Sequence, residues 1–418
     1  MAEVLVLSNP SGSSAREHAL AWKLSQSPEV KNVWLAPGNA GIKNSLPDLR
    51  SPEDFLRFAK QKNIDLTVVG PEALLATGVV DIFEAEGLPI FGPGQHVAQI
   101  ETSKIWCYKK SVEWGVPFAP SWPFYEGQQE LAKAKVHELG FPVVLKVDGL
   151  ADGKGVTIHE SEESAFNEIY DIMAGKYKSG GRDLLVQKLL KGKELSVFTL
   201  SDGENILTIP KAFRDYKWLN GLATGGMGGF GPVSITSSLL WQIEEQITRP
   251  TINGLREEGG FKGVLYTGLM LTDDGPVVFE QNARFGDPEC QLLIPLINSD
   301  LYQVLLSCTK GELANHGLDY FYGFTTGVVL SAEGYPAAPI GGDEIFGLNK
   351  YYDRDINVFH YQTRKRPDGK IETHGGRELT VVGYDTHSIE GSREKAYSAI
   401  GQNGIHFRGM QKRDDIAT

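Results

Sequence analysis

Short apolar runs alternate with segments of helical periodicity through the first hundred residues, and this order constrains the fold more than any other feature. Each apolar run is followed by Gly, Pro or Asn, which end strands. Such alternation is typical of an open, mostly parallel sheet covered by helices. We therefore expect an N-terminal doubly wound α/β domain over residues 1–102. The expected strands are Val4–Leu7, Val33–Ala36, Leu66–Val69 and Pro89–Phe91, and the expected helices include Arg16–Ser25 and Pro52–Gln61.

The loops after these strands are candidate ligand-binding segments, because such sheets bind ligands beyond the carboxyl ends of their strands. Gly and Pro can also simply terminate strands, but four such loops at one edge favour a ligand site. The loop Ser8–Ala15 is unusual, since it has one glycine, Gly12, and carries Pro10, which has no backbone N–H. Its helix start would still offer free N–H groups and a positive dipole end. The other loops are Ala36–Gly41, Val69–Ala73 and Phe91–Gly94.

The middle of the chain changes to antiparallel patterns. Phe141–Glu160 has the pattern strand, glycine-bearing loop, strand. Its loop Gly149–Gly155 is not a P-loop, because "GKG" leads into a strand from Val156 and not into a helix. We expect either an ordinary turn or a flap at a hairpin tip that closes over a nucleotide. The segments Leu184–Leu200 and Gly263–Phe285 are also expected to form antiparallel hairpins.

Two further segments complete the expected architecture. Thr272–Gly275 would supply the turn of the second hairpin. From about Thr326 the chain returns to short strands and one helix, Ser392–Ile400, which predicts a β-rich C-terminal domain. The glycine-dense segment Ala223–Pro232 is expected to be a loop whose backbone N–H groups can approach an anion, or else a flexible connector.

Lys146 interrupts the apolar strand Pro142–Val147. Alternation places it on the face opposite Val143 and Leu145. A lysine at this position either lies on a solvated face or holds an anion.

The segment "FEQNARFGDPE", Phe279–Glu289, is the strongest local signal. Period two places Glu280, Asn282 and Arg284 on one face of one strand. Two hard oxygen ligands beside a cation suit Mg²⁺, which takes one or two protein oxygens and completes its octahedron with water and phosphate. Arg284 could then face a transferred phosphoryl group. The alternative is the polar outer face of an amphipathic strand.

Composition narrows the function classes. The chain has 418 residues and a net charge of −12, which argues against a nucleic-acid or anionic-membrane surface. Its three cysteines show no CxxC spacing, so neither a disulfide framework nor a zinc site is expected. The N-terminus resembles a strand and not a signal peptide, and no apolar run approaches the ~18 residues of a transmembrane helix. We therefore expect a cytoplasmic protein.

Several motifs together resemble one family. They include "APGNAG", "ETSK", "LKVDGLADGKGV", "TGGMG", "FEQNARFGDPE" and, near the end, "HGGRELTVVG". In this order they are similar to the phosphoribosylamine–glycine ligase family of the ATP-grasp superfamily, over essentially the whole chain. The absence of a serine–histidine–acid or cysteine–histidine pattern fits, because phosphoryl transfer needs positioned charges and metal and no covalent nucleophile.

The resemblance implies three domains and an ATP-dependent carboxylate–amine ligase. The domains would be residues 1–102, an ATP-grasp core at 103–325 with a small lid at about 120–190, and a C-terminal domain at 326–418. The enzyme would join glycine to 5-phosphoribosylamine through a glycyl phosphate, in purine synthesis. Its cofactors would be ATP and Mg²⁺ or Mn²⁺. Its other partners would be small molecules, an amino acid and a phosphorylated amine, and it would be a monomer or homodimer.

The resemblance also implies site residues. The catalytic residues would be Arg284, Lys146 and Asp287. ATP would be bound by Lys104, Lys146, Gly153, Lys154, Gly155, Val156, Gln187, Lys188, Leu190 and Glu194. The other substrates would be bound by Arg16, Asn39, Glu72, Asp215, Lys217, Gly225 and Gly226. The metal would be bound by Glu280 and Asn282, the same pair that the strand periodicity indicates.

The chain departs from the family pattern mainly around the substrates. The loop at residues 8–15 is longer and poorer in glycine, the stretch at 214–224 is shortened, and Trp218 stands where a basic residue is usual. Asp152 adds a carboxylate to the flap, and Gln187 and Lys188 replace an acidic pair beside adenine. Two alternatives therefore remain: a ligase for a different amino acid and amine, and an inactive nucleotide-binding protein. The intact Glu280, Asn282 and Arg284 face argues against the inactive protein.

Overall fold

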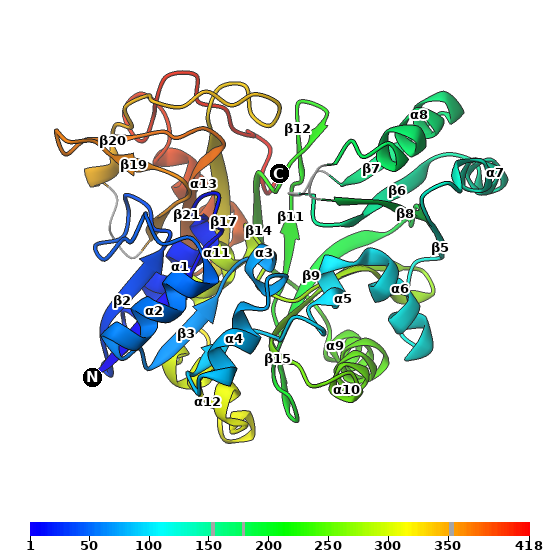
Figure 1. Cartoon of the computed structure of the whole chain (residues 1–418). Coiled ribbons are helices and arrows are strands. Elements are labelled where there is room, and N and C mark those ends of the chain that lie inside the picture. The colour runs from blue at the N-terminus through cyan, green and yellow to red at the C-terminus, as the bar shows by residue number, and fades with distance from the viewer. Residues whose placement is uncertain (152–154, 178–179, 351–354) are drawn as a thin grey trace.

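The computed structural model describes residues 1–151, 155–177, 180–350 and 355–418. Within them lie two four-stranded sheets, one nine-stranded sheet and two short two-stranded ribbons (Figure 1). The mixed α/β architecture, with an N-terminal α/β part and a sheet-rich C-terminal part, confirms the predicted fold class. No helix in the described ranges has both the length and the apolar character that a membrane span requires.

The N-terminal part is the expected parallel sheet, with strand order β2-β1-β3-β4. Alternate residues of β1 enter different cores: Val4 and Val6 pack with helix α1, whereas Leu5 and Leu7 pack with Phe55 of helix α2. Helices therefore cover both faces of the sheet. The elements are β1 (Ala2–Leu7), α1 (Ala15–Leu24), β2 (Val30–Ala36), α2 (Pro52–Lys62), β3 (Leu66–Val69), α3 (Glu72–Leu75), α4 (Val79–Ala85) and β4 (Ile90–Phe91).

A second four-stranded sheet forms the lid, which lies at the end of the molecule away from the N-terminal part (Figure 1). Its strand order is β5-β8-β6-β7, and all its pairs are antiparallel. A strand follows Gly155, as expected, and Lys146 pairs with Val156. Helices α5 (Gln99–Thr102) and α6 (Lys104–Glu113) precede the lid. The lid elements are β5 (Ser121–Phe124), α7 (Gln129–Leu139), β6 (Val143–Gly149), β7 (Val156–His159), α8 (Glu162–Met173) and β8 (Gly180–Lys188).

The nine-stranded sheet has the order β16-β15-β9-β11-β14-β17-β21-β18, with β10 paired to β9. The Thr272–Gly275 turn joins β15 and β16 as expected. The elements are β9 (Lys193–Asp202), β10 (Ile206–Thr208), β11 (Ala212–Asp215), β12 (Trp218–Leu219), β13 (Leu222–Ala223), β14 (Gly228–Val233), α9 (Ser237–Ile243), the π-helix Glu244–Thr248, α10 (Arg249–Glu257), β15 (Lys262–Thr272), β16 (Gly275–Asn282), α11 (Glu289–Leu293) and α12 (Leu301–Lys310).

The C-terminal part extends the same sheet. Strand β17 pairs with β14 on one side and with β21 on the other. The expected helix is present but begins earlier, at Ile389, because the Ser388 side chain accepts from Gly391 N and caps it. The elements are β17 (Phe324–Ser331), β18 (Ile356–His360), β19 (Arg364–Lys365), β20 (Ile371–Glu372), β21 (Arg377–Asp385) and α13 (Ile389–Ser398).

Two predictions of local structure are wrong. The segment Leu184–Leu200 is not a hairpin: β8 belongs to the lid sheet, whereas β9 pairs with β15 in the large sheet. The segment Ala223–Pro232 is not all loop, since Gly228–Val233 forms strand β14. Its glycines allow close neighbours, because a Cβ at Gly228 would lie 2.4 Å from Gly327 O.

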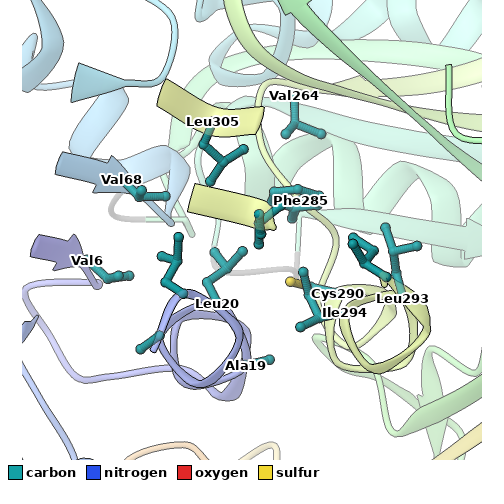
Figure 2. Close-up of a cluster of buried hydrophobic side chains, with 14 of the residues drawn as sticks. Val6, Ala19, Leu20, Val68, Val264, Phe285, Cys290, Leu293, Ile294 and Leu305 are labelled. Carbon is teal, nitrogen blue, oxygen red and sulfur yellow. The ribbon is translucent and has the colours of Figure 1, made fainter. Parts of the chain in front are cut away.

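One continuous core joins the N-terminal part to the rest of the molecule. Figure 2 shows Ala19 and Leu20 of α1 gathered with side chains of the parallel sheet and of the segments that follow β16. Helix α1 is therefore buried on both sides, and the loop before it is held against the large sheet. The other labelled side chains are Val6, Val68, Val264, Phe285, Cys290, Leu293, Ile294 and Leu305.

Candidate active site

A cavity of about 640 Å³ lies where the N-terminal part, the lid, the large sheet and the C-terminal strands meet. Asn39 and Gly226 are not among its lining residues, and Gly153, Lys154 and Asp152 lie outside the described residues. The predicted site residues that line it are Arg16, Glu72, Lys104, Lys146, Gly155, Val156, Gln187, Lys188, Leu190, Glu194, Asp215, Lys217, Gly225, Glu280, Asn282, Arg284 and Asp287.

Only two of the four predicted ligand loops reach this cavity, those at 8–15 and 69–73. The C-terminal part covers the loop Ala36–Gly41, because Ala40 N donates to Thr363 O and Asn39 Nδ2 donates to His360 O. The loop Phe91–Gly94 packs on the large sheet instead. Pro93 lies so close to Gly263 of strand β15 that a Cβ added at Gly263 would be 3.0 Å from Pro93 Cδ.

Two lysines stand at the lid side of the cavity. Lys146 Nζ donates to Phe279 O at 2.7 Å and lies 5.7 Å from the centre of the Phe279 ring. Burial lowers the pKa of Lys146 to about 8. Lys104 Nζ donates to Gly149 O at 2.8 Å. Two cations beside the apolar lining side chains of Val144 and Leu185 suit a nucleotide, whose base is apolar and whose phosphates are anionic.

Local capping explains why Lys104 is placed there. Helix α6 begins at Lys104 because Ser103 Oγ accepts from Trp106 N. Asp148, near the end of β6, accepts from Ser103 Oγ at 3.1 Å and from Ile105 N at 3.0 Å. The start of α6 is thereby fixed to the lid strand that carries Lys146.

Gln187 and Lys188 differ in their environment. Gln187 is buried, and its Nε2 donates to Ser121 Oγ at 3.0 Å, whereas Lys188 is exposed at the cavity mouth. Ser121 Oγ itself donates to Ala119 O, so it is an acceptor for Gln187. The Gln187 side chain is therefore held by the neighbouring strand β5.

Lys217 lies between two carboxylates in the middle of the cavity. Its Nζ is 3.1 Å from Glu194 Oε1 and 3.1 Å from Glu280 Oε1. Burial opposes charge on Lys217, but Glu280 and Glu194 raise its pKa. Burial likewise opposes charge on Glu280, but Lys217 and Lys146 lower its pKa to about 2. Glu280 is therefore ionised at neutral pH.

Glu280 and Asn282, the predicted metal pair, suit a hard divalent cation that takes its other ligands from water and phosphate. Glu280 offers an ionised carboxylate, and Asn282 offers an amide two residues further along the same cavity wall. The neighbouring strand β15 contributes Tyr266 and Met270 to the cavity and no carboxylate. Among the described residues, no group of three or more His, Cys, Asp or Glu side chains could hold a metal. Phosphate and water would have to complete the shell, as is usual for Mg²⁺.

Arg284 is held by carboxylates from the first part of the chain. Its Nε donates to Glu72 Oε2 at 3.1 Å, its Nη2 lies 2.7 Å from Glu101 Oε1, and its Nη1 donates to Phe285 O. Glu101 was not singled out from the sequence, although it opens the "ETSK" motif. Arg284 thus lines the cavity with each guanidinium nitrogen already donating to protein.

Asp287 connects three parts of the chain. It accepts from Ser14 Oγ, Tyr361 OH and Gln291 Nε2, each at 2.7 Å, and from Arg377 Nη2 at 3.0 Å. Burial opposes its charge, but Arg377 and Arg16 lower its pKa. Asp287 is therefore fully engaged by protein donors.

Arg377 is a cavity residue that sequence reasoning missed. Besides Asp287, it donates through Nη1 to Gly225 O at 2.6 Å, and its guanidinium lies 4.6 Å from the centre of the Tyr361 ring. It is the arginine of "HGGRELTVVG", and that motif was the only signal for it. The glycine segment beside it is sterically restricted, since a Cβ at Gly226, with φ of +104°, would lie 2.5 Å from Pro288 Cδ.

The loop Ser8–Ala15 uses its hydroxyl groups to hold itself in place. Ser14 Oγ accepts from Arg16 N and donates to Asp287, and Ser8 Oγ donates to Glu17 Oε2 at 3.1 Å. Arg16 Nε donates to Glu17 Oε1 at 2.6 Å, and both side chains are buried. The charge of Arg16 is therefore balanced by Glu17.

Asp215 has an unusual environment. Its Oδ1 is buried and has no hydrogen-bond partner among the residues that the structure describes. Burial and the nearby Glu289 raise its pKa well above the ordinary value. An acceptor of this kind in a cavity wall suits a ligand that brings an N–H or a positive charge.

Comparison with known proteins assigns the family. Models of phosphoribosylglycinamide synthetase match in three pieces: the N domain over residues 2–101, the ATP-grasp (A) domain over 102–290 and the C domain over 325–418. Phosphoribosylamine–glycine ligase of Neisseria meningitidis serogroup A is 40% identical over 418 residues, which are 97% of this chain and 97% of the relative.

Two further relatives agree. The trifunctional purine biosynthetic protein adenosine-3 of Gallus gallus is 40% identical over 97% of this chain, which spans 41% of that longer protein. The crystal structure of phosphoribosylamine–glycine ligase from Thermotoga maritima has a TM-score of 0.83 and 32% identity, and the match covers 99% of this chain and 100% of that one. The chain therefore belongs to the phosphoribosylglycinamide synthetase family.

Proposed function

We propose that this protein is an ATP-dependent ligase that joins glycine to 5-phosphoribosylamine, with glycinamide ribonucleotide, ADP and phosphate as products. One observation carries the proposal most strongly. A single cavity lined by residues of all three matched family domains holds Lys104 and Lys146, an ionised Glu280 with Asn282, and Arg377 of the C-terminal part. The full-length similarity to phosphoribosylamine–glycine ligases supports the substrate pair.

The reaction has two steps. A carboxylate oxygen of glycine attacks the γ-phosphorus of ATP, the bond to the ADP oxygen breaks, and glycyl phosphate forms. The amine nitrogen of phosphoribosylamine then attacks the carbonyl carbon, phosphate leaves, and the amine loses a proton. Positioning and charge stabilisation suffice for both steps. Lys104 and Lys146 would hold ATP phosphates, and Asp215 would accept from an amine.

The same proposal includes the metal. Glu280 and Asn282 would hold Mg²⁺ or Mn²⁺ between protein and phosphates, and that ion would neutralise the charge that develops on the phosphoryl oxygens. Around it, Lys217 would keep Glu280 ionised, and Gly155 and Val156 would stand at the flap. Arg284 and Asp287 would shape the wall beyond the metal pair.

The proposal also includes the domain boundaries, the localisation and the oligomeric state. We propose domain boundaries after residues 102 and 325, with the lid at about 120–190. We also propose a cytoplasmic enzyme that acts as a monomer or homodimer. The domain boundaries and the oligomeric state follow from the family resemblance, and the localisation follows from the cysteine content and the short apolar runs of the sequence.

The decisive experiment measures ADP release and product mass with glycine and 5-phosphoribosylamine generated in situ, against a panel of other amino acids and amines. The proposal predicts glycinamide ribonucleotide, with glycine preferred. Intact ATP binding without this product, and turnover with another pair, would replace the proposal by a paralogous ligase. The Trp218 side chain and the serine-rich loop, which both line the cavity, would then be the first places to look for the altered specificity.

A further inference from the structure

Glu101 lies behind the metal pair and contacts three consecutive residues of the strand end. Its Oε2 accepts from Ala283 N at 2.8 Å, and its Oε1 lies 2.7 Å from Arg284 Nη2. With its amide oriented so that donors meet acceptors, Asn282 also donates to the same Oε1 at 3.2 Å. The Glu101 side chain is only 6% exposed, so water does not replace these contacts. One carboxylate of α5 therefore receives donors from all three residues.

These contacts determine which end of the Asn282 amide faces the cavity. In the orientation assigned from hydrogen bonding, the amide nitrogen donates to both Glu101 Oε1 and Gln281 O, each at 3.2 Å, and both are acceptors. Turning the amide over would place its oxygen against two other oxygens and lose both hydrogen bonds. An amide NH₂ cannot ligate a cation, whereas the amide oxygen can.

We propose that Glu101 is a positioning residue, which fixes the Asn282 amide so that its oxygen is available to a divalent cation. This inference rests on the proposed function, in which Glu280 and Asn282 hold that ion. Arg284 keeps the Glu101 carboxylate in place, because the guanidinium is also anchored by Glu72 on its other side. Outer partners of this kind typically change metal affinity by about 10–100-fold when they are removed.

The test measures Mn²⁺ binding without turnover. The full chain is held in excess over ADP, so that all nucleotide is bound, and free Mn²⁺ is followed by its electron paramagnetic resonance signal. Glu101→Gln keeps the shape of the side chain, but glutamine presents one donor and one acceptor end in place of two acceptor oxygens. It therefore no longer favours one orientation of the Asn282 amide. We expect its dissociation constant for Mn²⁺ to rise about tenfold. Glu101→Asp, which shortens the reach to Asn282, should behave similarly and serves if Glu101→Gln does not fold.

Glu72→Gln is the matched control. It removes a carboxylate from the same guanidinium, but Glu72 lies on α3 and makes its hydrogen bond and ion pair with Arg284 and not with Asn282. Its dissociation constant for Mn²⁺ should rise far less than that of Glu101→Gln, because a glutamine at position 72 can still accept from Arg284 Nε and Arg284 Nη1 still donates to Phe285 O. An equal loss in Glu72→Gln and Glu101→Gln would mean that Arg284, and not the Asn282 amide, mediates the effect, and would overturn the proposal.

The Asn282→Asp variant tests whether the effect of Glu101→Gln on Mn²⁺ affinity changes direction. Both terminal atoms of an aspartate at position 282 are oxygens, so either one can ligate the cation whichever way the side chain turns. Glu101 would then face a second negative charge at close range. Glu101→Gln should therefore tighten Mn²⁺ binding in this background, or leave it unchanged, although it weakens binding in the wild-type background. A purely structural role of Glu101 would weaken binding in both backgrounds.

The outcomes separate the two proposals. If Glu280→Gln loses Mn²⁺ binding while Glu101→Gln and Glu101→Asp retain it, the positioning role is wrong and the metal pair stands. If the wild type binds no Mn²⁺, or Glu280→Gln binds it as the wild type does, the metal assignment of the proposed function is wrong, and the positioning role is overturned with it.

Discussion

Lys217 Nζ lies 3.1 Å from Glu280 Oε1, and this ion pair sits inside the cavity. Both groups are mostly withdrawn from water, yet the pair keeps Glu280 ionised, because Lys217 and Lys146 outweigh the effect of burial on its pKa. The carboxylate is thus ionised at neutral pH, and the metal ion of the proposed function would bind it without displacing a proton. Under the proposed function, a divalent cation at Glu280 would displace the Lys217 ammonium, which would retain Glu194 as a partner.

Glu280→Gln should remove metal-dependent turnover and leave the fold intact. The bound ion is expected to supply several kcal/mol of charge stabilisation, so kcat should fall by about 100-fold or more. Steady-state rates over a Mg²⁺ titration would measure this. Glu194→Gln, which removes the other partner of Lys217, is the control and should change the KM for ATP more than the Mg²⁺ dependence. Unchanged turnover and Mg²⁺ dependence in Glu280→Gln would rule out the metal assignment.

Lys146→Met should make the protein more stable at pH 7 while raising the KM for ATP. Burial lowers the folded-state pKa of Lys146 to about 8, against 10.5 ordinarily. The unfolded chain therefore binds more protons between these pH values, so wild-type stability rises with pH from about 8 to 10.5. Below pH 8 the charged lysine costs the folded state up to about 3 kcal/mol.

The check for Lys146→Met is denaturant unfolding at pH 7, 8.5 and 10, with ATP kinetics at pH 7. The stability gain of the variant should shrink as the pH rises. Exposed Lys188→Met is the control and should leave stability unchanged. If Lys146→Met is instead less stable at pH 7 and uses ATP normally, Lys146 has a structural role.

Arg16→Met should destabilise the protein, because it leaves the fully buried Glu17 without its cation. Breaking one partner of a buried pair typically costs about 3–5 kcal/mol. The double variant Arg16→Met/Glu17→Gln removes both charges and should recover most of that loss. Amine kinetics in the double variant then separate two roles of Arg16. A KM for 5-phosphoribosylamine that stays high supports phosphate recognition, whereas a return to the wild-type KM limits Arg16 to balancing Glu17.

Acid should weaken the contact between helix α1 and strand β18. His18 Nδ1 accepts from His360 N at 2.9 Å, and burial lowers the pKa of His360 to about 4 and that of His18 well below 6.5. The unfolded chain binds these protons first, so stability should fall as pH drops from 6.5 toward 4. Each histidine contributes about 1.4 kcal/mol per pH unit.

Unfolding free energies at pH 6.5, 5.5 and 4.5 would measure this acid limb. His360→Gln removes one of the two protons and should give a shallower slope, whereas exposed His137→Gln should not change it. An unchanged slope in His360→Gln would show that other groups cause the acid sensitivity.

Local periodicity carried much of the fold prediction. The parallel sheet follows from apolar runs of strand length separated by helical segments, and the β15–β16 turn follows from Thr272–Gly275. Period two was also sufficient to place Glu280 and Asn282 along one wall, because side-chain direction in a strand is a local property. Arg284, predicted on the same strand, lies beyond the end of β16 at Asn282 and reaches the cavity from the following bend. The family motifs supplied the three-part architecture.

Long-range pairing was decided only by the tertiary structure. Strands β8 and β9 are neighbours in sequence, yet they lie in different sheets, because β9 pairs with β15 over ten residues. Strand β14 forms by pairing with β17, and glycine is required at position 228 because a Cβ there would lie 2.4 Å from Gly327 O. Neither partner is encoded within a short window of sequence.

The candidate site also combines features set by local sequence with features set by long-range contacts. The sequence by itself determined which side chains are candidates for the chemistry, because residue type and strand alternation are local. Only the tertiary structure decided what holds them. Glu101 reaches Asn282 and Arg284 across about 180 positions, and Arg377 reaches Asp287 across 90. Such contacts depend on how helices and sheets pack, and packing depends on the whole chain.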